Sequence, residues 1–91
     1  MAEGNWTFLS NHGHVLVYVA RHPEALITDI ADAVGITARA TQSILNDLVD
    51  AGYLLRTRVG RRNVYEVDGS QPLRHPIESE HKVGQLIASL R

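Results

Sequence analysis

The sequence contains no cysteine among its 91 residues, and its longest apolar run is the short stretch Val15–Ala20. The missing thiols exclude disulfides and thiolate metal sites, and they are compatible with a reducing cytoplasm, where we expect the protein to act. The apolar run is far shorter than the roughly 20 residues that span a bilayer. The first residues carry no basic segment ahead of an apolar run, so we expect neither a signal peptide nor a membrane partner.

The sequence also lacks an excess of positive charge, because nine Lys and Arg stand against ten Asp and Glu for a net charge of −1. A histone-like protein that coats DNA through bulk charge is therefore not expected. The charge is unevenly placed, however, since residues 53–65 hold four arginines and no acidic residue. A near-neutral chain with one basic patch is typical of a protein that presents one face to phosphate.

Catalytic signatures are missing as well. The sequence has no Gly-rich phosphate loop, no nucleophile elbow and no paired-carboxylate arrangement. Its length predicts one domain, and a core this small leaves little room for a substrate cavity of about 300 Å³ or more. We therefore predict a protein that is not an enzyme and that needs no cofactor.

A first helix is predicted from Ser10, which can cap it, to about Arg21. Pro23 ends this helix, because the residue before a proline disfavours the helical conformation. The run Val15–Ala20 is rich in β-branched residues and leaves a strand open as the alternative.

A second, shorter helix is predicted over residues 29–34. Leu26 and Ile27 are expected to be extended, and Thr28 is expected to cap the helix. Gly35 follows as the residue that is free to adopt a left-handed conformation.

A third helix is predicted over residues 38–51, with Thr37 as its cap and Gly52 at its end. Its buried stripe is expected to consist of Thr41, Ile44, Leu45, Leu48 and Val49. If this stripe faces inward, the opposite face offers polar side chains to base edges. Arg can bridge guanine O6 and N7, and Gln can bridge adenine N6 and N7. We predict base contacts from Ala38, Arg39, Gln42, Ser43 and Asn46, with an ordinary solvated helix face as the alternative.

The second and third helices match a helix-turn-helix motif. Ala31 supplies the small side chain that two closely crossing helices need, Gly35 supplies the turn, and Ile44 supplies the apolar anchor. Such motifs usually carry Val or Ile where this sequence has Thr41. The Thr41 methyl can still pack, and its hydroxyl can bond a backbone carbonyl.

Two strands follow, at about residues 53–59 and 63–68, joined by a tip at residues 60–63. A basic hairpin directly after such a helix is a wing, whose arginines lie along phosphates or enter a narrow minor groove. Over the wing, residues 56–63, and at the helix cap, we predict backbone or wing contacts from Thr37, Arg56, Arg58, Arg61, Arg62 and Asn63. The alternative is a solvated hairpin in which Glu66 pairs with Arg56 or Arg58.

A last helix is predicted over residues 75–91, with Pro76 at its first position. The core is already complete by Val67, so part of the apolar stripe on this helix lacks a partner within the chain. Such a stripe usually marks an interface. We therefore predict a homodimer held by Ile77, Val83, Leu86, Ile87 and Leu90, with a helix that folds back within a monomer as the alternative.

These elements predict an α+β, mainly helical fold. It is a winged helix-turn-helix with a three-helix core, a β-hairpin wing and an additional C-terminal helix. The predicted organisation is an N-terminal arm (1–9), a DNA-binding domain (10–68), a linker (69–74) and a C-terminal dimerisation helix (75–91).

The stretch Ile27–Val67 resembles the MarR-like and ArsR-like winged-helix transcriptional regulators. Trp6–Pro23 and Leu73–Leu90 resemble compact MarR-type regulators of the actinobacterial type. The resemblance covers nearly the whole chain and implies sequence-specific binding of double-stranded DNA, with major-groove contacts at Arg39, Gln42 and Ser43 and wing contacts at Arg61 and Arg62. It identifies no operator and no small-molecule effector. Full-length MarR proteins carry further terminal helices, and this chain has little beyond the core.

Two other functions stay open. The ArsR-like regulators include metal sensors, and this chain has five histidines. His75, Glu78 and His81 lie at positions i, i+3 and i+6 near the last helix. The sequence has no cysteine to bind a soft metal, and we predict that the protein binds no metal. The other alternative is a protein-interaction module that uses the acidic residues Asp47, Asp50, Glu78 and Glu80.

Overall fold

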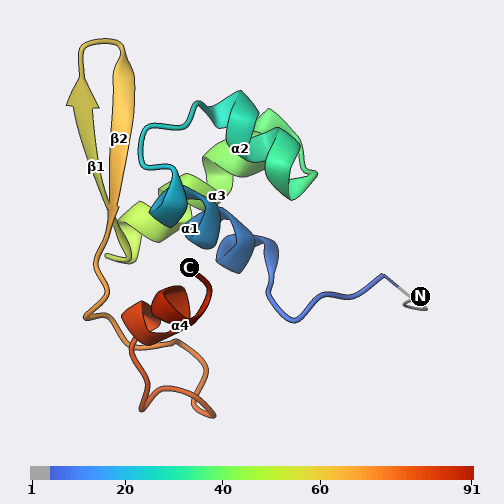
Figure 1. The fold of residues 1–91 in the computed structure, drawn as a ribbon, viewed down its shortest axis with the longest axis vertical. Helices are drawn as coiled ribbons and strands as arrows, with labels where there is room; N and C mark the ends of the chain where they lie inside the picture. Colours follow the sequence, from blue (N-terminus) through green and yellow to red (C-terminus); the bar gives the residue numbers. More distant parts are fainter. Residues whose placement is uncertain (1–4) are drawn as a thin grey trace.

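The computed structural model describes residues 5–91 and has the predicted winged helix-turn-helix arrangement (Figure 1). Within these residues the elements follow the order α1 (Asn11–Arg21), α2 (Ile27–Val34), α3 (Ala38–Asp50), β1 (Leu54–Val59), β2 (Arg62–Val67) and α4 (Val83–Ser89). Residues 1–4 of the predicted arm lie outside the described residues. No helix in the described part of the chain is long and apolar enough to cross a membrane.

Helix α1 begins and ends where the local sequence predicts. The Ser10 hydroxyl accepts a hydrogen bond from the Gly13 N–H at 3.2 Å, which satisfies one free donor of the first turn. At the other end, His22 precedes Pro23 and leaves the helical conformation. The β-branched run therefore forms a helix and not a strand, and its buried face consists of Val15, Leu16 and Val19.

Helix α2 begins at Ile27, earlier than predicted. Leu26 is the extended residue before it, and Thr28 lies inside its first turn, so the predicted cap at Thr28 is wrong. Leu26 offers no side-chain cap, but the Asp29 Oδ2 in the first turn accepts a hydrogen bond from the Leu26 N–H at 3.3 Å. A carboxylate in the first turn also interacts favourably with the helix dipole.

One hydrophobic core joins the helices to the hairpin. Helix α1 packs against both α2 and α3, and it contributes Val15 and Val19, which are almost fully buried. The hairpin adds Leu54 and Tyr65 from the ends of its two strands nearest the helices. The other buried members of this core are Leu16, Ile30, Ile44, Leu45, Leu48, Tyr53, Val83 and Ile87.

The two strands pair antiparallel, from Leu54 opposite Val67 to Val59 opposite Arg62. The turn therefore consists of Gly60 and Arg61 alone, shorter than the predicted tip. Gly60 has a φ of 62° and Arg61 has no positive φ, which is the pattern of a type II′ turn. Because such a turn matches the twist of the strands, Arg62 and the residue after it belong to β2 and not to the tip.

Alternation along the strands gives the hairpin two different faces. Leu54 and Tyr65 share the inner face with Arg56 and Arg58, because the register pairs residue 56 with 65 and residue 58 with 63. The outer face includes Leu55, which is 60% exposed.

The C-terminal segment departs most from the prediction, since α4 begins at Val83 and not at His75. An antiparallel bridge between Pro72 and Lys82 closes the intervening loop, in which residues 76–80 form turns. The backbone hydrogen bonds beside this bridge run from Leu73 N–H to His81 O at 2.9 Å and from Val83 N–H to Gln71 O at 2.8 Å. Backbone groups used in this way cannot join a continuous helix.

Helix α4 packs onto its own chain. Val83 and Ile87, two of the predicted dimer residues, are only 3% and 4% exposed and belong to the core. The backbones of Gly69 and Gly84 touch, so that a Cβ at Gly84 would lie 2.9 Å from the Gly69 carbonyl oxygen. The prediction that Val83 and Ile87 belong to a dimer interface is therefore wrong, because both pack within their own chain.

A turn anchored by Asp68 leads out of β2. Its carboxylate accepts hydrogen bonds from the Ser70 hydroxyl at 2.6 Å, the Ser70 N–H at 3.0 Å and the Gln71 side-chain amide at 3.2 Å. These bonds, that of the Ser70 hydroxyl first, hold the pKa of Asp68 below its ordinary value of 3.8. The stabilisation from this turn is therefore present above that value and is lost as the pH falls through the lowered pKa.

We expect Leu45→Ala to lower the free energy of unfolding by about 2–5 kcal/mol, because Leu45 is fully buried and its truncation leaves a cavity. Circular dichroism should show a clearly lower melting temperature before any ligand is added. The matched control is Leu55→Ala on the outer face of the hairpin, which should change stability by no more than about 0.5 kcal/mol. An unchanged melting temperature for Leu45→Ala would contradict the orientation of α3.

Candidate nucleic-acid interface

The turn between α2 and α3 has the predicted geometry. Ala31 is buried between the two helices, and its carbonyl accepts hydrogen bonds from the N–H groups of Gly35 at 2.8 Å and Ile36 at 3.1 Å. Gly35 has a φ of 86°, the left-handed conformation that the turn requires. Ile44 is buried in the core, as its role of anchor demands.

The first turn of α3 is held by two threonines. The Thr37 side chain caps the helix, since its Oγ1 accepts a hydrogen bond from the Ala40 N–H at 3.0 Å. Thr41 is fully buried, and its hydroxyl donates to the Thr37 carbonyl at 2.9 Å. The predicted hydrogen bond from the buried Thr41 hydroxyl to a backbone carbonyl is therefore confirmed.

One side of α3 is buried in the core, and the residues predicted to contact bases lie on the opposite side. The buried residues of the helix are Thr41, Ile44, Leu45 and Leu48. The predicted polar residues follow the spacing i, i+3, i+4 and i+7 and so share one helix face. Ala38, Arg39, Ser43 and Asn46 are exposed, and Gln42 is half-buried.

A hydrogen-bonded cluster connects this face to the wing. The Asn46 Oδ1 accepts from the Gln42 Nε2 at 3.1 Å and from the Arg56 Nη1 at 2.9 Å. The sequence predicted all three residues as DNA contacts but did not predict that they contact one another. Gln42 and Asn46 are neighbours at i, i+4, a spacing that the sequence does reveal.

The remaining wing arginines lie in different surroundings. The Arg58 Nε donates to the Gly60 carbonyl at 3.0 Å, within the hairpin itself. The Arg62 Nη2 donates to the Glu24 carbonyl at 3.1 Å, which ties β2 to the loop between α1 and α2. Arg61, at the turn, is exposed.

Glu66 does not pair with an arginine as the alternative reading required. The register places it opposite Leu55, on the outer face of the hairpin, whereas Arg56 and Arg58 lie on the inner face. A shift of one residue in strand register exchanges the two faces, which is why composition alone could not decide this point.

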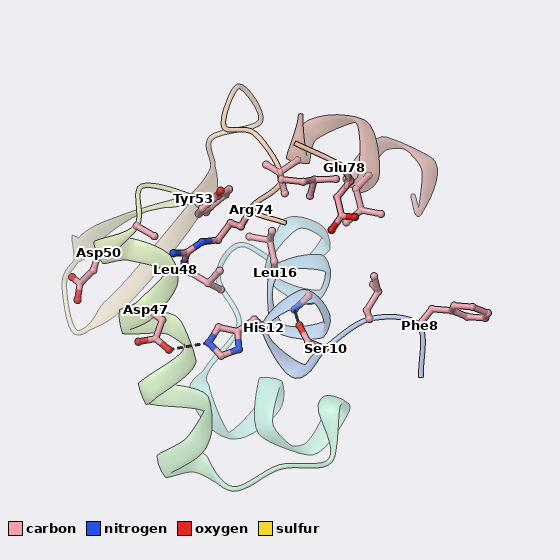
Figure 2. A pocket seen from close by; sticks show the side chains of 16 residues that line it. Phe8, Ser10, His12, Leu16, Asp47, Leu48, Asp50, Tyr53, Arg74 and Glu78 are labelled. Carbon is pink, nitrogen blue, oxygen red and sulfur yellow. Dashed lines mark hydrogen bonds and ion pairs between the residues drawn. The ribbon is translucent and has the colours of Figure 1, made fainter. Parts of the chain in front are cut away.

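A cleft of about 850 Å³ opens between α1, the end of α3 and the C-terminal segment (Figure 2). The cleft is open to solvent at the side of the core and does not test the expectation that the core itself leaves little room for a cavity. The His12 Nε2 lies 2.8 Å from the Asp47 Oδ2 on one wall, and Arg74 and Glu78 line the C-terminal side. His12 and Asp47 are far apart in the sequence, and no local signal could have paired them.

His75, Glu78 and His81 do not come together as a metal site. His75 and His81 lie in the turns before α4, with the His75 Nδ1 accepting a hydrogen bond from the Ile77 N–H at 3.1 Å. No group of three His, Asp or Glu side chains within residues 5–91 is placed to hold a metal ion.

A protein-family model described as the MarR family matches residues 7–62, which run from within the arm through the wing turn. The chain belongs to the MarR family. The match includes the turn between α2 and α3 and most of the predicted contact residues. A search of curated proteins gave no match.

The fold of this MarR-family chain is similar to the solved structure of MepR, a transcription regulator of the Staphylococcus aureus multidrug efflux pump MepA. The TM-score is 0.58 at 18% sequence identity, and the alignment covers 88% of this chain. It covers 55% of the MepR chain, so this chain spans little more than half the length of that regulator. At this identity the likeness shows a shared fold.

In this MarR-family turn, Gly35→Ala should lower the free energy of unfolding by about 1–2 kcal/mol. No atom would touch the added methyl, but a side chain at a φ of 86° is strained by its own backbone. Urea titration measures the change. Gly35→Asn is the matched control, because Asn tolerates this conformation and should retain most of the stability. Equal losses for the two variants would indicate that the turn is not left-handed in solution.

Proposed function

We propose that this MarR-family chain is a sequence-specific, double-stranded DNA-binding transcriptional regulator. Helix α3 enters the major groove, and the wing lies on the backbone or in the minor groove. The observation that carries the proposal is one face of α3 that holds Arg39, Gln42, Ser43 and Asn46. It lies beside a hairpin whose residues 54–65 include four arginines and no acidic residue. We expect the protein to act in the cytoplasm, where such DNA is accessible.

The side chains divide between base contacts and backbone contacts. Arg39 suits guanine, Gln42 suits adenine, and Ser43 can serve several bases. Arg58 and the exposed Arg61 suit phosphates, which position a protein without specifying sequence. Arg62 has further N–H groups beyond the one bonded to Glu24, so it can hold the wing and contact phosphate together.

The proposal predicts that selection from a random duplex library enriches one site, with a dissociation constant of about 10⁻⁸ M or tighter. Because phosphate contacts release counterions, the logarithm of affinity should fall linearly with the logarithm of salt concentration. Arg61→Ala should weaken binding to all duplexes and lower the salt slope by roughly one. Selection that enriches no sequence, with affinity unaffected by salt, would sink the proposal.

Arg74→Ala provides the matched control for that measurement. It removes the same charge, but Arg74 lines the cleft at the C-terminal segment and not the wing (Figure 2). Its salt slope should equal that of the unaltered protein. Equal reductions in the two variants would mean that net charge, and not contact at the wing, sets the slope.

A homodimer is the second part of the proposal. Trp6 and Phe8 stack edge to face with ring centroids 5.0 Å apart, and Phe8, at the outer edge of the cleft, is 93% exposed (Figure 2). Ile77 is 85% exposed on the loop before α4. These apolar groups support an interface made by the arm, the exposed Ile77 and the half-buried Leu86 and Leu90. Two such copies read two half-sites about one helical turn apart.

Sedimentation equilibrium at micromolar concentration should therefore give a mass near twice 10.1 kDa. Phe8→Glu and Ile77→Glu should lower it toward the monomer, because each places a charge on the apolar interface. Leu55→Glu on the outer face of the wing is the control and should leave the dimer intact. A constant monomer mass for the unaltered protein would refute this interface.

A further inference from the structure

The wing residue Arg56 contacts helix α3 by one specific hydrogen bond. It comes from the inner face of β1, on the same side as the buried Leu54, and this orientation aims its guanidinium at α3. The Nη1 donates to the Asn46 Oδ1 at 2.9 Å. The same oxygen accepts from the Gln42 Nε2 at 3.1 Å, so both of its lone pairs are occupied.

This bond fixes which way the Asn46 amide faces. A guanidinium has five N–H donors and no acceptor, so it can bond only the oxygen of a carboxamide and never its nitrogen. The Asn46 Oδ1 is therefore held toward the hairpin, and the Nδ2 with its two protons is left for the exposed side. Without Arg56, only the Gln42 amide still bonds the Asn46 oxygen. A carboxamide can either donate or accept, so Gln42 and Asn46 can then rotate together and turn the Asn46 oxygen outward.

We propose that Arg56 is a specificity-determining positioning residue that makes Asn46 a pure hydrogen-bond donor toward the DNA. The proposal rests on the DNA-binding function proposed above. An asparagine that reads adenine must use its oxygen for the N6 amino group and its nitrogen for N7. With its oxygen occupied, Asn46 instead favours guanine, whose O6 and N7 both accept hydrogen bonds. Arg56 thus selects the base without touching it.

Arg58 provides a built-in comparison for this role. It lies on the same strand and the same face as Arg56, carries the same charge, and bonds the Gly60 carbonyl and not α3. If wing arginines act only through phosphates, loss of either one weakens binding to all duplexes alike and lowers the salt slope by roughly one. Only a residue that orients a base-reading side chain changes the order of preference among bases.

The test is to repeat the duplex selection for the unaltered protein, Arg56→Ala, Arg56→Lys and Arg58→Ala. Competition between duplexes that differ at the single base pair assigned to Asn46 then measures the preference. Arg56→Ala should lower the guanine-over-adenine ratio at that pair by roughly fivefold or more, since one oriented contact is lost. Arg56→Lys should restore most of the ratio, because an ammonium group also only donates. Arg58→Ala should leave the ratio unchanged.

Two Asn46 variants test the route of the effect. In an Asn46→Ala background, Arg56→Ala should cause no further change in base preference, which a double-mutant cycle measures directly. Asn46→Asp keeps an oxygen that accepts the Arg56 hydrogen bond but removes the N–H donors. This variant should therefore lose the guanine preference although the contact between the hairpin and α3 remains. Melting temperatures of all variants, followed by circular dichroism, show that each compared protein is folded.

The outcomes separate the two proposals. If the unaltered protein enriches no site, the DNA-binding function itself fails. If it enriches a site, but Arg56→Ala weakens all duplexes equally and behaves as Arg58→Ala does, the orienting role of Arg56 is overturned. A change of preference in Arg56→Ala that persists in the Asn46→Ala background would equally overturn it, because the effect would not pass through Asn46.

Discussion

Burial of one stripe on α3 is the constraint on which the rest of the molecule depends. Thr41, Ile44, Leu45 and Leu48 face the core, and an α-helix with 3.6 residues per turn then has no freedom in what it exposes. The polar residues between them must face outward. Rotating the helix would bring Leu45, a fully buried side chain, into water, so the candidate interface is maintained by hydrophobic packing on the opposite side of the same helix.

Packing against the same core also sets the orientation of the hairpin. Leu54, the first residue of β1, is buried, and this fixes which face of the strand points inward. Side chains alternate along a strand, so Arg56 is directed at α3 two residues later. The Tyr53 hydroxyl donates to the Pro72 carbonyl and links the start of the hairpin to the C-terminal segment. Packing at one end of the strand thus positions a charged group further along it.

Local signals made much of the fold predictable. Ser10, Thr37 and Gly35 act within a few residues of their own positions, and α1, the turn and α3 were found where these residues indicated. Pairings between distant segments were not predictable. The Arg56–Asn46 bond depends on strand register, and the late start of α4 depends on the bridge between Pro72 and Lys82. The residues that share the outward face of α3 were predicted as a set, but the hydrogen bonds among them were not.

The hairpin is fastened to the body at two places besides the chain itself. The Tyr65 N–H donates to the Pro23 carbonyl at 2.9 Å, and the Arg62 guanidinium reaches the next carbonyl along the same loop. On the other side, Arg56 fastens it to α3. A surface loop that must be ordered on binding loses conformational entropy, and this loss reduces affinity. A hairpin held from both sides has already lost that freedom during folding. Its separation from α3 is therefore a fixed distance between the two proposed sets of DNA contacts.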